Sequence, residues 1–149
     1  MLFYKLVYYF DMSSCLHCNR IVSKNNKYCS NQCQADYAYI RFIDEWKLGR
    51  VNGDRGEKAK NISNHLRRYL HVKFEEKCAR CGWNEINPQT GMSPLEIEHI
   101  DGNAENNLEE NLTLLCPNCH SLTFSYKNLN KGNGRAWRRL KYTREISIK

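Results

Sequence analysis

Lysine and arginine are absent from a run of 46 residues, 81–126, in a chain of 149 residues whose formal net charge is +7. The same run contains seven acidic residues: Glu85, Glu96, Glu98, Asp101, Glu105, Glu109 and Glu110. Long apolar runs are also missing, because the N-terminal segment "MLFYKLVYYF" has only ten residues, whereas a membrane-spanning helix needs roughly 20. No small-residue cleavage site follows it, so neither a membrane span nor a secretory signal is expected.

Basic residues gather on both sides of the acidic run. Residues 127–149 contain eight Lys or Arg and one Glu, and residues 55–80 contain eight Lys or Arg and three Glu. Basic segments of this kind suit a polyanion, because each phosphate contact releases counterions. A solvated, solubilising surface has the same composition. Charge alone therefore leaves open both nucleic-acid binding and a merely soluble surface.

The eight cysteines fall in four close pairs with two or three residues between the members of each: Cys15 and Cys18, Cys29 and Cys33, Cys78 and Cys81, Cys116 and Cys119. Two such pairs complete the tetrahedral thiolate site of a structural zinc ion, and disulfide frameworks are not usually spaced in this way. The sequence therefore predicts two structural Zn²⁺ sites, one from the four N-terminal cysteines and one closing a loop between "CARC" and "CPNC". Redox cysteines and disulfides are the alternatives.

Hydrophobic periodicity predicts a helix over residues 31–48 and an amphipathic helix within residues 62–78. The second helix has Ser63 or Asn61 as its cap and Leu66, Tyr69, Leu70 and Phe74 on its buried face. "LEIEHI" and "ENLTLLC" are predicted strands on either side of the turn signal "DGN", and "PNCHSLTFSYK" is a predicted short helix. The expected fold class is α+β, with a small zinc-stapled strand–strand–helix module behind an N-terminal zinc finger and helix.

The expected organisation has five parts. Residues 1–11 are an N-terminal extension, either a strand or disordered, and residues 12–48 are the zinc finger with its helix. Residues 49–61 are a glycine-rich linker. Residues 62–126 form the strand–strand–helix domain with its own zinc, and residues 127–149 are a basic tail.

Four polar residues of the strand–strand–helix unit resemble a known motif. Glu98 and His99 end the first predicted strand, Asn111 opens the second, and His120 begins the helix. With the phrases "LEIEHIDGN", "ENLTLLCPNCHS" and "KGNGR", they resemble the HNH endonucleases of the ββα-metal (His-Me finger) family, and in particular the small zinc-knuckle members of bacteriophages. Taken singly, Glu98 and His99 could be a surface pair, Asn111 a turn residue, and His120 a zinc ligand or helix cap.

The resemblance implies a metal-dependent DNA endonuclease that hydrolyses phosphodiester bonds, by nicking or by double-strand cleavage. His99 is then the expected general base, Glu98 and His120 hold a divalent ion, and Asn111 fixes the loop that aims His99. A carboxylate oxygen and an imidazole favour Mg²⁺ or Mn²⁺, with Ni²⁺ as a further candidate. Family members with more ligands carry another histidine on the same helical face, where this chain has Phe124.

The strand itself sets a geometric condition on the two neighbouring residues. Consecutive residues of a regular strand point to opposite faces. Glu98 and His99 can therefore serve one site only if the strand ends or bulges at this point, and the Asp101-Gly102 pair just beyond suits such an end.

Basic side chains outside the acidic run are the expected contacts to the DNA backbone: Arg67, Arg68, Lys73, Arg135, Arg138, Arg139 and Lys141. The chain is expected to be a monomer or weak dimer, without membrane association, in the cytoplasm of a bacterial or phage-infected cell. The alternative function is a non-catalytic, zinc-dependent DNA-binding protein with an HNH fold. Both functions predict salt-sensitive DNA binding, and only the enzyme predicts metal-dependent plasmid relaxation.

Overall fold

The computed structural model describes residues 12–56 and 61–130 of the chain. The chain divides into two compact units, Met1–Leu48 and Gly49–Lys149, each of which is described by itself. The predicted N-terminal extension and the basic tail from residue 131, with Arg135, Arg138, Arg139 and Lys141, lie outside the described residues. Within the described ranges, no helix combines the length and the apolar character that crossing a membrane would require.

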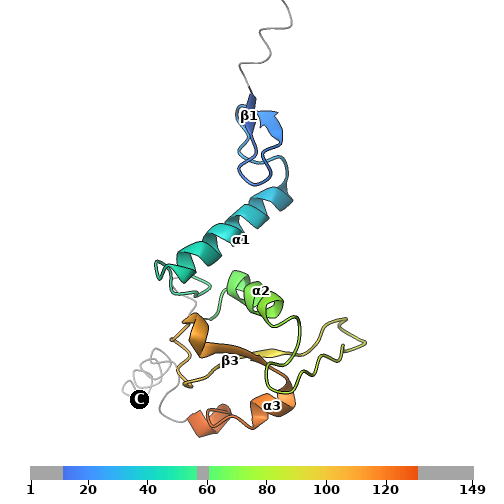
Figure 1. Ribbon diagram of the computed structural model, residues 1–149, viewed down its shortest axis with the longest axis vertical. Helices are drawn as coiled ribbons and strands as arrows, with labels where there is room; N and C mark the ends of the chain where they lie inside the picture. The colour runs from blue at the N-terminus through green and yellow to red at the C-terminus, as the bar shows by residue number, and fades with distance from the viewer. Residues whose placement is uncertain (1–11, 57–60, 131–149) are drawn as a thin grey trace, which may run out of the picture. The chain divides into compact units, whose positions relative to one another are not determined.

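The first unit consists of a small hairpin followed by one long helix (Figure 1). Strands β1 (Met12–Ser14) and β2 (Ile21–Ser23) pair antiparallel. Helix α1 (Asn31–Lys47) follows, and the Ser30 hydroxyl caps it by accepting a hydrogen bond from the backbone N–H of Cys33 at 3.1 Å. The predicted helix over residues 31–48 is thus confirmed to within one residue.

The second unit begins its regular structure with helix α2 (Asn64–Lys73). Of the two predicted caps, Ser63 holds this position, and its Oγ accepts a hydrogen bond from the backbone N–H of Leu66 at 3.1 Å. Leu66 and Leu70 of the predicted apolar face are fully buried. This buried face is what holds α2 against β4.

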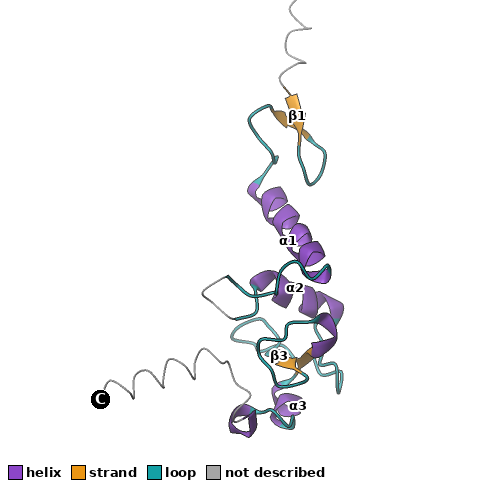
Figure 2. Cartoon of the chain, turned by 90° about the vertical axis from the view of Figure 1, so that its left-hand side faces the viewer, coloured by secondary structure: helices purple, strands orange, loops and turns teal. Residues whose placement is uncertain are grey.

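A hairpin and a short helix complete the second unit. Strand β3 (Glu96–His99) pairs antiparallel with β4 (Leu112–Leu115), with Glu96 opposite Leu115 and His99 opposite Leu112. A short 3-10 turn, η2 (Glu109–Asn111), leads into β4, and helix α3 (Pro117–Ser121) follows it with Pro117 in its first turn. A second 3-10 turn, η3 (Lys127–Asn130), comes last. Strand β3 lies between α2 and α3 in both views (Figures 1 and 2).

The hydrophobic core of the second unit includes its cysteines. The core cluster consists of Cys78, Leu95, Leu114, Leu115, Cys116 and Cys119, with Phe74, Trp83 and Ile97 packed against it. Three of the four cysteines of the second predicted zinc site are therefore core residues. The apolar core is small, so a zinc ion bound by these cysteines would contribute much of the folding stability of this unit.

Replacing Leu114 with alanine is expected to destabilise the second unit by about 2–5 kcal/mol. Leu114 is 0% exposed and belongs to the core cluster, so its truncation leaves a cavity. Chemical denaturation of the zinc-loaded protein measures the change. Leu122→Ala is the matched control, because Leu122 is 71% exposed and should change the stability by less than about 0.5 kcal/mol. Equal effects of the two substitutions would contradict the assigned core.

Candidate active site

The eight cysteines form two tetrads in the structure. Cys15, Cys18, Cys29 and Cys33 make the first, Cys78, Cys81, Cys116 and Cys119 make the second, and within each the sulfur atoms all lie within 4.8 Å of one another. This is the local pairing that the sequence predicts. Both sets have the all-sulfur composition of a structural zinc site with no open position for chemistry.

Backbone amides stabilise one thiolate in each tetrad. Hydrogen bonds to the sulfur of Cys15, first among them that from the Cys18 backbone, lower the pKa of this thiol to about 6. Burial opposes ionisation of Cys78, but the backbones of Cys116 and Cys81 outweigh it and lower the pKa of Cys78 to about 6. The hydrogen bond with Cys29 raises the pKa of Cys33 to about 12. A bound Zn²⁺ would supply the positive charge that ionises the remaining thiols.

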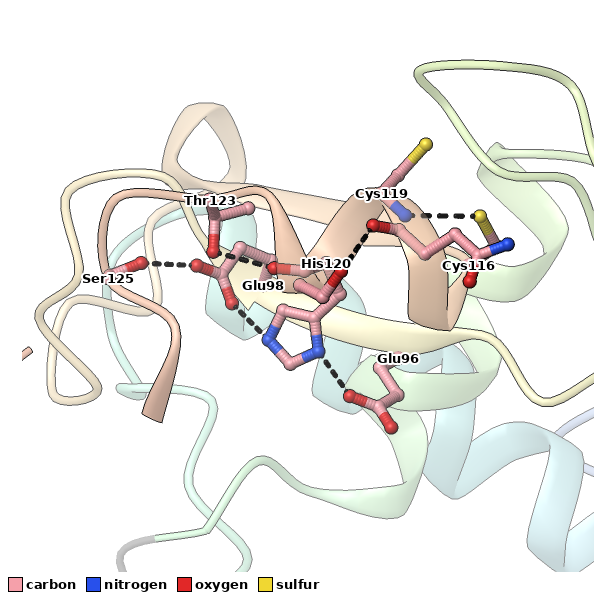
Figure 3. A network of polar contacts seen from close by, with 9 residues as sticks. Glu96, Glu98, Cys116, Cys119, His120, Thr123 and Ser125 are labelled. Atoms are coloured by element: carbon pink, nitrogen blue, oxygen red, sulfur yellow. Dashed lines mark hydrogen bonds and ion pairs between the residues drawn. The ribbon is translucent and has the colours of Figure 1, made fainter. Parts of the chain in front are cut away.

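The imidazole of His120 lies between two carboxylates of β3 (Figure 3). Its Nε2 is 2.9 Å from Oε2 of Glu98, and its Nδ1 contacts Oε2 of Glu96. Glu96 and Glu98 are two apart on a regular strand, so both point to the face that α3 covers. The structure thus brings together Glu98 and His120, as the resemblance implies, and adds Glu96 on the opposite ring nitrogen.

The segment after α3 returns to this cluster. Ser125 is buried, and its hydroxyl donates a 2.5 Å hydrogen bond to Oε1 of Glu98. The family resemblance implies that Phe124 lies on the same helical face as His120, but helix α3 already ends at Ser121. Phe124 is 66% exposed, and a histidine in its place would not stand one helical turn from His120.

His99 is the last residue of β3, and its side chain is held by a different partner. Its Nε2 is 2.9 Å from Oδ1 of Asn107. The register is regular up to His99 opposite Leu112, so His99 and Glu98 point to opposite faces of β3. Among the described residues no hydrogen bond joins His99 to Glu98 or His120. Glu98 and His99 can serve one site only where the strand ends or bulges, and β3 does end at His99.

Asn111 fastens the loop that follows His99. It lies in the 3-10 turn before β4 rather than in the strand, and it is buried. Its side-chain amide donates to Asp101 Oδ1 at 2.9 Å and to the Asn106 carbonyl at 2.8 Å, while its Oδ1 accepts from the Asp101 backbone N–H at 3.0 Å. Three hydrogen bonds from one side chain thus fix the shape of residues 101–106.

The carboxylate of Asp101 is ionised within this loop. Desolvation opposes its ionisation, but hydrogen bonds from the Asn106 side chain, the Asn103 backbone and the Asn111 side chain outweigh it. The pKa of Asp101 therefore lies below its usual value of 3.8. A charged acceptor strengthens the hydrogen bonds that hold the loop.

The predicted DNA contacts in the described part of the chain lie on α2. Arg67 and Arg68 are exposed and line a groove of about 670 Å³ with Met92 and Leu95. The Nζ of Lys73 instead pairs with Oε1 of Glu109 at 2.7 Å. Arg67 and Arg68 are thus placed along this groove, whereas Lys73 would have to leave its ion pair with Glu109 to contact a phosphate.

Three residues near the predicted site are not predicted from the sequence: Glu96, Asn107 and Ser125. Strand alternation alone could have indicated Glu96, since it lies two residues before Glu98. Ser125 and Asn107 reach their partners across 27 and 8 residues of chain through loops, and loops carry no periodicity that could reveal the contact.

Residues 78–123 match the family model of the HNH endonucleases. The H-N-H endonuclease F-TflIV of Escherichia phage T5 is 48% identical to this chain over 56 residues, which cover 38% of this chain and 24% of the phage protein. No solved structure matches the chain significantly. The residues of the motif fall inside the matched range, on β3, in the turn before β4 and on α3. Residues 78–123, the HNH domain, are accordingly similar to the HNH endonucleases.

Proposed function

We propose that the protein is a metal-dependent DNA endonuclease in which His99 is the general base and Glu98 and His120 hold a divalent ion. One observation carries the proposal. Glu98 from β3 and His120 from α3 place a carboxylate oxygen and an imidazole nitrogen 2.9 Å apart, directly beside the strand end that carries His99. This pair lies in the HNH domain, whose relatives include a phage protein named as an endonuclease.

The residues present fit a hard or borderline divalent cation. Glu98 and His120 offer one oxygen and one nitrogen, a donor set that suits Mg²⁺ or Mn²⁺ and also Ni²⁺. In residues 12–56 and 61–130, the only groups of three or more side chains placed to hold one ion are the cysteine tetrads. Two protein ligands leave room for phosphate oxygens and water. When bound, such an ion would neutralise charge on the phosphate and stabilise the departing 3′ oxygen.

The chain's own residues supply the remaining chemistry. His99 uses a ring nitrogen to take a proton from the attacking water, which a neutral imidazole can do near neutral pH. Asn111 holds the loop after His99 in one shape. Residues 81–126 contain no lysine or arginine, so no such side chain of this run competes with a metal cation for its carboxylates. Basic residues outside the run, such as Arg67 and Arg68, hold the DNA backbone.

A plasmid assay with the purified full chain tests this function. Supercoiled plasmid is incubated with the protein and Mg²⁺, Mn²⁺ or Ni²⁺, with and without EDTA, and the relaxed and linear forms are separated. The expected result is relaxation that requires one of these ions and stops with EDTA. Intact plasmid in every metal and buffer, with salt-sensitive DNA binding retained, would favour the alternative of a DNA-binding protein without catalysis.

Glu96→Ala is expected to weaken binding of Mn²⁺ at the Glu98–His120 pair by about 10-fold. Glu96 contacts Nδ1 of His120, and a carboxylate there fixes the tautomer whose Nε2 lone pair faces a cation. Titration calorimetry of the zinc-loaded protein with Mn²⁺ measures the affinity. Glu85→Ala is the matched control, because Glu85 is an exposed glutamate of the same acidic run. A loss of affinity in the control as large as that in Glu96→Ala would assign the effect to net charge.

A further inference from the structure

Asn107 is a buried amide that joins His99 to a segment far away in the sequence. It is only 2% exposed. Its Nδ2 donates to the Asn52 carbonyl at 2.9 Å and to Asp54 Oδ1 at 3.1 Å, and its Oδ1 lies 2.9 Å from His99 Nε2. Asn52 and Asp54 lie 55 and 53 residues before Asn107, outside the range that matches the HNH family.

The segment that holds Asn107 is itself fixed to α2. Asn52 Nδ2 donates to Asp54 Oδ2 at 3.1 Å, so the carboxylate of Asp54 is oriented from its other side. The backbone N–H of Ser63, the cap of α2, donates to the Gly53 carbonyl at 2.9 Å. Residues 52–54 fall in the predicted linker, yet they are bonded to both α2 and the loop before β4. Hydrogen bonds therefore hold these residues on both sides.

These partners determine which way the Asn107 amide points. A carbonyl and a carboxylate accept hydrogen bonds and cannot donate them, so the nitrogen of Asn107 must face Asn52 and Asp54. The amide oxygen must then face His99. An oxygen acceptor requires a proton on the nitrogen it faces, so the neutral ring of His99 carries its proton on Nε2. Its Nδ1 keeps the lone pair, and no described residue hydrogen-bonds to that atom.

We propose that Asn107, oriented by Asp54, is a positioning residue that fixes neutral His99 as the Nε2–H tautomer and so presents Nδ1 as the base. The inference rests on the proposed function and deepens it, since it names the ring atom that accepts the water proton. It also makes the segment before α2 part of the catalytic apparatus, because Asp54 acts on His99 through Asn107. A histidine with the proton on Nδ1 would present no base on that side.

The test combines ring spectroscopy with cleavage kinetics on the full zinc-loaded chain. Long-range ¹H–¹⁵N spectra of ¹⁵N-histidine protein, at a pH where the ring is neutral, show which nitrogen of His99 carries the proton. In the wild type we expect the proton on Nε2, protected from exchange. In Asn107→Ala we expect the Nε2 proton to exchange with water, so that its signal disappears. We also expect kcat for plasmid relaxation to fall about 10-fold, because one hydrogen bond to the base is lost, while KM stays unchanged.

Asp54→Ala and Asn26→Ala complete the experiment. Asp54→Ala should lower kcat by about 3-fold, less than Asn107→Ala does, because the Asn52 carbonyl still orients the Asn107 amide. Asn26→Ala is the control, since Asn26 is an exposed asparagine of the other compact unit. It should keep both the wild-type spectrum and the wild-type rate.

Two results would overturn the inference: a wild-type proton on Nδ1 of His99, or wild-type kcat in Asn107→Ala. The ring spectrum needs neither DNA nor a divalent ion, so it separates this inference from the proposed function. A wild-type protein that leaves plasmid intact but has the proton on Nε2 would contradict the endonuclease and support the hydrogen-bond assignment.

Discussion

Replacing His99 with alanine is expected to reduce DNA cleavage by about 10²–10⁴-fold, the usual contribution of a general base, while DNA binding persists. Cleavage needs an activated water, and His99 is the histidine that lies at the end of β3 outside the Glu98–His120 pair. Under the proposed function, DNA binding depends on phosphate contacts made by basic residues elsewhere. The measurements are plasmid relaxation under single-turnover conditions and the dissociation constant for a DNA duplex.

The matched control and a chemical rescue make this test specific. His17→Ala removes a histidine from outside the HNH domain and should leave cleavage at the wild-type rate. In His99→Gly the vacated space should admit free imidazole, and added imidazole should restore part of the rate if His99 only moves a proton. Persistent cleavage in His99→Ala, or loss of DNA binding in parallel with cleavage, would contradict the assignment of His99 as the base.

Cys116→Ser is expected to unfold the HNH domain. Cys116 joins β4 to α3: its Sγ accepts the capping hydrogen bond from the Cys119 backbone at 3.4 Å, and the residue belongs to the core cluster. The apparent binding free energy of a structural zinc in small domains is about 10–16 kcal/mol, which is comparable to or larger than the total stability of about 5–15 kcal/mol typical of a domain. Circular dichroism should show that the unfolding transition of the domain is lost. Native mass spectrometry should show one bound zinc ion in place of two.

Cys33→Ser is the matched control for the second tetrad. Cys33 belongs to the first tetrad, in the unit Met1–Leu48. Its replacement should likewise remove one zinc, while the unfolding transition of the HNH domain remains. If Cys116→Ser keeps both zinc ions and a cooperative unfolding transition, zinc binding at the second tetrad does not stabilise the domain.

Local structure in this chain is predicted well because its signals are local. The helix expected over residues 31–48 is α1, Asn31–Lys47, and the helix expected within residues 62–78 is α2, capped by Ser63. The strands within "LEIEHI" and "ENLTLLC" are β3 and β4. Caps, apolar periodicity and cysteine spacing act over a few residues, so they are visible before any tertiary contact is known.

Two expectations near the site differ from the structure because of tertiary contacts. "PNCHSLTFSYK" is expected to be helical, yet α3 ends at Ser121. The chain leaves the helix there, and Ser125 becomes buried against Glu98. Asn111 is expected to open a strand but lies in the 3-10 turn before β4. From that turn its side chain bonds Asp101 and the Asn106 carbonyl.

The sequence by itself determines the two cysteine tetrads, the α+β order of elements and the HNH motif with Glu98, His99, Asn111 and His120. Only the tertiary structure decides what these side chains contact: Glu96 on the second nitrogen of His120, and Asn107 with Asp54 behind His99. The physical reason is the range of the interactions. Periodicity and capping depend on neighbours along the chain, whereas a hydrogen bond between residues 54 and 107 exists only once α2, β3 and β4 have packed.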